Sequence, residues 1–181
     1  MEPLSIKDVI NFQPLLWLHP SLVQDVIRQQ SGIRQAILNS ALMRKYSLGL
    51  ITNECFSQPK VNLFCENWFY LKQAAYYMAC YRHRSAIMQS LTWHSLSTGA
   101  GVFMQCSLTA NCAVQITHRY QINIEALACR EIMALAAGLP ESVKMRVALM
   151  FNYFEQDDEL IPSADINLFS MALTHAKNYP V

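Results

Sequence analysis

Glycine and charged residues are scarce in this 181-residue sequence. Five glycines and seven prolines leave little room for the frequent turns of an all-β fold, and no stretch has a convincing strand pattern. Asp, Glu, Lys and Arg make up 15% of the chain, whereas soluble domains contain about a quarter. Hydrophobic residues make up 52%. Two interpretations stay open: a compact helical protein with a large core, or one that also keeps apolar surface for partner proteins.

A strong excess of charge of one sign is also missing, since the net charge is +1. This argues against nucleic acid as the main ligand, because nucleic-acid-binding domains are usually strongly basic. The charges are nevertheless uneven. Residues 1–84 contain nine Lys and Arg against five Asp and Glu, and residues 85–181 contain five against eight. Such a chain is suited to contact two different partners, although charge runs are more often solvated faces.

No segment is long and apolar enough to be a candidate membrane span. Residues 85–118 hold no Asp, Glu, Lys or Arg, but fifteen Ser, Thr, Gln, Asn and His interrupt them, whereas a span needs about 20 mostly apolar residues. The opening Met1-Glu2-Pro3 lacks the basic and apolar regions of a secretory signal. We therefore expect the six cysteines to be free thiols in a reducing compartment.

Motifs of known catalytic and metal sites are absent from the sequence. There is no G-x-G-x-x-G, no G-x-x-x-x-G-K-[ST] and no G-x-S-x-G. Cys80 and His83 are close in sequence, as are Cys106, Cys112 and His118, but no C-x-x-C or H-E-x-x-H pair accompanies them. Cys80 beside His83 is also a candidate thiol nucleophile. We favour core cysteines over both, and expect no catalytic residue, no metal and no cofactor.

The most hydrophobic segment runs from Val61 to Arg84. Its apolar residues recur at steps of four and three, the period of one helix face: Phe64, Trp68, Leu71, Ala75 and Met78. A second apolar row beside them widens the hydrophobic arc, so neighbours on several sides are needed to bury it. We predict one continuous helix over residues 61–84 at the centre of the fold, with Trp68 in the core.

Other amphipathic runs, separated by helix-ending residues, account for most of the chain. They cover residues 4–12, 33–44, 85–93, 95–107, 110–117, 124–137, 140–154 and 164–177, with a linker over residues 47–60. In the run 33–44 the predicted core face is Ile33, Ile37, Ala41 and Leu42, and the predicted solvent face is Arg34, Gln35, Asn39 and Arg44. The predicted fold is all-α: a single compact domain, residues 1–181, of eight or nine helices packed around the central helix.

Charged groups of opposite sign are the first candidates for protein binding. Arg82 and Arg84 end the predicted central helix, and Asp157, Asp158 and Glu159 lie in an acidic stretch. We expect both groups to be exposed, which makes them candidate electrostatic docking sites. For the acidic stretch a solvated loop is the alternative, and it lacks the central glycine of a calcium-binding EF-hand.

Three stretches together resemble the SctK family of bacterial type III secretion systems, the group of OrgA, MxiK and YscK. Trp17-Leu18-His19-Pro20 resembles the family's aromatic-x-His-Pro segment. The middle helix of the family is similar in order and spacing to Trp68, Leu71, Gln73, Ala75, Tyr76, Cys80 and Arg84. The end of the chain, from Ala172 to Pro180, looks like the end of the OrgA branch. Trp17 and His19 thereby join the candidate protein-binding residues.

The resemblance implies a helical, non-enzymatic adaptor in the bacterial cytoplasm, at the inner-membrane base of the secretion apparatus. Its implied partners are the SctQ-like pod protein of the sorting platform and the cytoplasmic domain of the SctD-like inner-membrane ring protein, without nucleic acid or direct membrane insertion. Two other functions stay open. One is a type III secretion chaperone or helical regulator that binds a secreted substrate, and the other is a small helical enzyme that uses Cys80 and His83.

Overall fold

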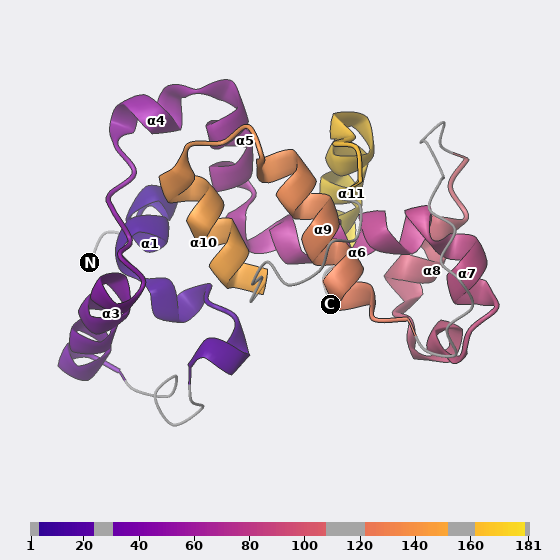
Figure 1. Ribbon diagram of the computed structural model, residues 1–181, viewed down its shortest axis with the longest axis horizontal. Coiled ribbons are helices and arrows are strands. Elements are labelled where there is room, and N and C mark those ends of the chain that lie inside the picture. The colour runs from indigo at the N-terminus through magenta and orange to yellow at the C-terminus, as the bar shows by residue number, and fades with distance from the viewer. Residues whose placement is uncertain (1–3, 24–30, 108–121, 152–161, 180–181) are drawn as a thin grey trace. The chain divides into compact units, whose positions relative to one another are not determined.

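The computed structural model describes residues 4–23, 31–107, 122–151 and 162–179 of the protein. The regular structure of these residues is helical. Figure 1 shows these residues as a coloured ribbon. They form ten α-helices and four short 3-10 helices, and within those ranges there is no strand. The predicted all-α fold is confirmed. The predicted helix at 110–117 and the acidic stretch at 155–159 lie outside the described residues.

The chain divides by its contacts into two compact units. Unit 1 contains Met1–Phe69 and Ala136–Asp157, and unit 2 contains Tyr70–Leu135 and Asp158–Val181. Each unit is therefore assembled from two separate segments of sequence. The single domain over residues 1–181 stays a prediction.

Unit 1 is built around a core of large apolar side chains. Its elements are α1 (Ile6–Phe12), η1 (Pro14–Leu16), η2 (Pro20–Leu22), α3 (Ile33–Lys45), α4 (Asn53–Ser57), α5 (Pro59–Glu66) and α10 (Glu141–Phe151). Ile10, Leu18, Phe64 and Trp68 are at most 1% exposed. The Trp17 and Trp68 rings meet edge to face, with 5.8 Å between their centres. This geometry is one that aromatic pairs prefer.

A buried guanidinium, Arg146 of α10, connects three parts of unit 1. Its Nε donates to the carbonyl of Ile10 at 3.2 Å, and its Nη1 to the carbonyl of Ser142 at 2.8 Å. Its Nη2 lies 3.5 Å from Oδ1 of Asn11, and Asn11 exchanges two hydrogen bonds with the backbone of Ile51, at 3.0 and 3.1 Å. Burial lowers the pKa of Arg146 to about 10. The cation lies at the C-terminal end of α1, which a helix dipole favours.

Unit 2 is built on α6 (Leu71–Arg82), which packs against α8 (Thr98–Met104) and α11 (Ile166–Asn178). Figure 1 shows α6 in magenta and α11 in yellow. The other elements are α7 (Arg84–Met88), η4 (Leu91–Ser95) and α9 (Ile124–Ala136). Ala74 and Ala75 of α6 are fully buried, and small residues of this kind let neighbouring helices approach closely.

The predicted continuous helix from Val61 to Arg84 is wrong, because the chain bends twice within it. Asn67 ends α5 with φ −108° and ψ 19°, and its Nδ2 donates to the carbonyl of Leu63 at 2.7 Å. Asn side chains compete in this way with the backbone bonds that would extend a helix. A 3-10 turn, η3 (Trp68–Tyr70), follows, and α6 ends at a second irregular residue, His83. The first bend lies where unit 1 gives way to unit 2.

Two further predictions need correction. The predicted linker over residues 47–60 contains α4, whose cap is Thr52, and the first residues of α5. Helix α3 is rotated about its axis from the predicted orientation: Ile33 and Ile37 of the predicted core face are 81% and 63% exposed, while Asn39 of the predicted solvent face is 6% exposed. Asn39 is buried because its Oδ1 accepts the backbone N–H of Leu15, at 3.0 Å. An exposed α3 surface results.

Among the helices that the structure describes, none combines the length and the apolar character that a membrane crossing requires.

Candidate protein-binding surfaces

The candidate thiol nucleophile, Cys80, is fully buried in α6. Burial raises its pKa to about 12, so the thiol is protonated at neutral pH. Burial and the positive charges of Arg82 and Arg130 lower the pKa of His83 to about 4. Nδ1 of His83 has no hydrogen-bond partner among the described residues. Both side chains are neutral and enclosed, which suits a core.

The described residues contain no group of three or more His, Cys, Asp or Glu placed to hold a metal ion. The five described cysteines are free thiols: Cys55, Cys65, Cys80, Cys106 and Cys129. Cys112 and His118, of the second candidate ligand set, lie outside the described residues.

Arg82, expected at an exposed basic end, is only 9% exposed. Its Nε lies 3.0 Å from Oε2 of Glu131, and its Nη2 donates to the carbonyl of Ser163 at 2.9 Å. A second carboxylate, Asp165, is 3.9 Å from the same nitrogen. The expected exposure of Arg82 is therefore wrong. Periodicity within one helix does not reveal that α9 and the residues just before α11 provide its acceptors.

Burial of this charge cluster sets the protonation of Glu131. Removal from water raises the pKa of its carboxyl to about 7, and the nearby Arg82 charge opposes that rise. Asp165 adds to it through like-charge repulsion. The cluster links α6, α9 and α11 within unit 2.

Arg84 is the member of the predicted basic pair that reaches the surface, since it is partly exposed. Its guanidinium carbon lies 4.8 Å from the centre of the Tyr81 ring, a cation–π contact. Asp157, Asp158 and Glu159 lie outside the described residues. Docking through these charges stays a prediction.

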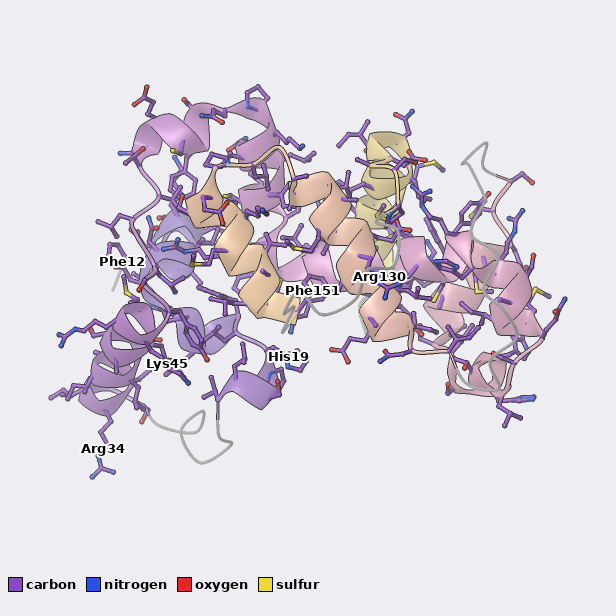
Figure 2. The ribbon with its side chains drawn as sticks, in the orientation of Figure 1. Phe12, His19, Arg34, Lys45, Arg130 and Phe151 are labelled. Carbon is purple, nitrogen blue, oxygen red and sulfur yellow. The ribbon has the colours of Figure 1, made fainter. Side chains whose placement is uncertain are left out.

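Trp17 and His19, from the aromatic-x-His-Pro segment, occupy different environments in unit 1. Trp17 is 3% exposed, and its Nε1 donates to the carbonyl of Val9 at 3.3 Å. His19 is partly exposed (Figure 2), and its Nδ1 accepts the backbone N–H of Ser21 at 3.2 Å, which caps η2. The backbone N–H of His19 donates to the carbonyl of Leu149 in α10. These bonds hold the segment against α1 and α10 within unit 1. Of the two side chains, His19 is the more accessible to a partner.

An exposed surface that the sequence did not predict lies on α3. We call it the α3 face and define it by its exposed residues: Ile33, Arg34, Ala36, Ile37, Ser40, Ala41, Arg44 and Lys45. Figure 2 labels Arg34 and Lys45 and shows the Arg34 side chain extending away from the helix. The signal in the sequence is Asn39, one polar residue whose burial turns the isoleucines outward.

A second group of exposed apolar side chains lies in unit 2, on α7, η4 and α8. Met88 and Leu91 are 60% and 71% exposed, and Trp93 and Val102 are 36% and 41% exposed. Isolated exposed apolar residues are common on soluble proteins, and contiguous patches mark interaction surfaces.

Comparison with known proteins gives one family and a set of relatives. A family model described as bacterial type III secretion apparatus protein, OrgA_MxiK, matches residues 8–178. Relatives named oxygen-regulated invasion protein OrgA, from Salmonella typhimurium strains 14028s, SL1344 and LT2, are each 25% identical over 177 residues. The alignment covers 94% of this chain and 86% of each relative. No solved structure matches the chain.

Proposed function

Because the chain belongs to the OrgA_MxiK family of bacterial type III secretion apparatus proteins, we propose that it is a non-enzymatic adaptor of that apparatus. It works in the bacterial cytoplasm, at the inner-membrane base of the secretion machine. There it links the cytoplasmic domain of the SctD-like ring protein to the SctQ-like pod protein. The observation that carries this proposal is the family match over residues 8–178.

The chemistry of the described residues supports binding over catalysis. The candidate nucleophile Cys80 is enclosed, with its pKa raised to about 12. In contrast, the α3 face and the apolar side chains on α7, η4 and α8 lie open on the surface. Surfaces of this kind suit a protein that is held between others.

A secretion assay together with affinity purification tests the adaptor. Deletion of the gene is expected to stop the export of all substrates, and a tagged full-length chain is expected to co-purify with both the ring protein and the pod protein. A chaperone would give a different result, since its loss would lower one substrate and leave the apparatus intact. Unchanged secretion after deletion would overturn the proposal.

The Cys80→Ser variant separates the adaptor from the enzyme. It is expected to retain secretion and partner binding in the folded protein, because serine removes the thiol and keeps a side chain of similar size. Loss of secretion with normal folding and normal partner binding would favour chemistry at Cys80 instead.

A further inference from the structure

We propose that the α3 face is a docking site for an acidic amphipathic helix of a partner protein. The identity of that partner as a member of the secretion apparatus rests on the proposed function, whereas the docking site itself rests on the geometry and charge of α3.

The spacing of the exposed residues is that of a helix-packing seam. Ile33, Ile37, Ser40 and Arg44 follow one another at steps of four, three and four, the period with which two helices interlock side chains. Ile33 is 81% exposed and Ile37 is 63% exposed. The opposite side of α3 is already used within unit 1, where α3 packs on η1 and α1. The seam is therefore the side that is open to a second helix.

The charge of α3 selects an acidic partner. Residues 31–53 contain no Asp or Glu, whereas Arg34, Arg44 and Lys45 all lie exposed on the α3 face. A second copy of α3 would bring these cations against one another in either orientation, and like charges across an interface are unfavourable. Carboxylates flanking the apolar stripe of a partner helix would instead complement them.

The side-chain sizes favour a helix over a lipid surface. Three small residues, Ala36, Ser40 and Ala41, lie exposed beside the isoleucines, and small residues let helix backbones approach closely. Helices that lie in a membrane interface instead present Trp, Phe and Leu, because their binding scales with the apolar area inserted. No exposed residue of α3 is aromatic.

Site-specific photocrosslinking tests the occupant in secreting cells with the full-length chain. A benzoylphenylalanine residue is placed at position 37, and at position 50 as the control, because Leu50 of unit 1 is similarly exposed, at 59%, but lies outside α3. The expected result is a crosslink from position 37, weak or absent from position 50, to a helical segment of an apparatus protein with Asp or Glu beside its apolar stripe. A crosslink to another copy of this chain, to lipid or to a segment without acidic residues would overturn the proposal, as would no crosslink.

Binding of purified proteins then tests the two chemical components separately. With the crosslinked protein as the probe, Ile33→Ser combined with Ile37→Ser is expected to weaken binding about tenfold or more, whereas Leu50→Ser leaves it unchanged. Arg34→Glu with Arg44→Glu is expected to slow association most at low salt, because the attraction is screened as salt rises. Wild-type binding by either double variant, with an unchanged circular-dichroism spectrum, would contradict the site.

Two further measurements separate this proposal from its alternatives. The chain is expected not to sediment with phosphatidylcholine vesicles that contain phosphatidylglycerol. If it does sediment, and Ile33→Ser with Ile37→Ser abolishes the sedimentation, the α3 face binds a membrane and the proposed partner helix is contradicted. If gene deletion stops secretion but the isoleucine variant secretes and binds normally, the adaptor stands and the α3 site falls. If deletion leaves secretion intact, the proposed function falls, whatever position 37 crosslinks to.

Discussion

Arg82 and Arg84 are close together in sequence but are expected to contribute differently to the free energy of unfolding. Arg82 is enclosed beside Glu131, whereas Arg84 is partly exposed over the Tyr81 ring. Arg82→Ala removes the cation and leaves a buried carboxyl, so it is expected to cost about 3–5 kcal/mol of unfolding free energy. Arg84→Ala, the matched control, is expected to cost about 1 kcal/mol or less. Urea unfolding measures both, and equal losses would contradict the structural role of Arg82.

Glu131 is expected to make stability depend on pH. Its pKa rises from 4.5 to about 7 on folding, because burial disfavours the charged form. The folded state therefore holds more protons between these values, and the contribution of Glu131 is present below pH 4.5 and lost as the pH rises through 7. Glu131→Gln removes this dependence, so its stability relative to wild type is expected to rise across that interval in urea unfolding at a series of pH values.

His83 makes the opposite contribution to the pH dependence of stability. Glu131→Gln must therefore be compared with wild type at each pH. Its pKa falls from 6.5 to about 4 on folding, so its contribution grows as the pH rises between these values. A stability difference between Glu131→Gln and wild type that is flat from pH 5 to pH 8 would contradict the raised pKa of Glu131.

Trp68 is predicted from the sequence to lie in the core, and the structure confirms it at 1% exposure. Trp68→Ala removes its edge contact with Trp17 and leaves a cavity, at a cost of roughly 3–5 kcal/mol. Trp93→Ala is the matched control, because Trp93 is 36% exposed. Thermal unfolding is expected to show a large drop in Tm for the first variant and a small one for the second.

At the scale of one helix, α8 contains two glycines with opposite expectations. A Cβ at Gly99 would lie 2.5 Å from Oη of Tyr77, whereas a Cβ at Gly101 meets nothing within 4 Å. Tyr77 has little freedom to move aside, because it is fully buried and its hydroxyl donates to the carbonyl of Tyr179 at 3.1 Å. The contact between α8 and α6 therefore needs glycine at position 99.

Alanine substitutions at these two positions test that requirement. Gly99→Ala is expected to destabilise the protein by about 1–3 kcal/mol through overpacking. Gly101→Ala is expected to stabilise it by roughly 0.5–1 kcal/mol, since alanine loses less backbone entropy in a helix. Chemical denaturation measures both, and a stabilising Gly99→Ala would show that Tyr77 yields.

Helices with clear ends were predictable, and those whose position depends on a distant polar group were not. Residues 124–137 and 164–177 were predicted as helices, and the structure has α9 at Ile124–Ala136 and α11 at Ile166–Asn178. Two asparagines explain why predictions elsewhere are wrong. The side chain of Asn67 bonds to the backbone and ends a helix, and the buried bond of Asn39 rotates α3 about its axis. The hydrophobic period reports the spacing of apolar residues. It does not show which asparagine side chain has a hydrogen-bond partner in the core.

The candidate binding residues show the same limit. The exposure of Arg82 depends on Glu131 and Ser163, which lie far along the chain, so the helix pattern alone could not reveal it. The α3 face was missed because the spacing of its isoleucines is that of a core face. The hydrogen bond from Leu15 to Asn39 instead places Asn39 inward and the isoleucines outward.

For the whole molecule, the order of segments constrains how it folds. The chain passes from unit 1 to unit 2 between Phe69 and Tyr70, and returns between Leu135 and Ala136. Helix α10 therefore reaches unit 1 only after most of unit 2 has been made. It supplies Arg146, whose side chain is fully buried and bonds to the carbonyl of Ile10 in α1.

A fragment of residues 1–69 is therefore expected to lack a native fold. It loses Arg146 together with Val143 and Val147, which are fully buried in unit 1, and its short helices are marginal without packing partners. Far-ultraviolet circular dichroism is expected to show little helix, and addition of a peptide of residues 136–157 is expected to restore part of it. A fragment that is helical and unfolds cooperatively alone would show that α10 is dispensable to unit 1.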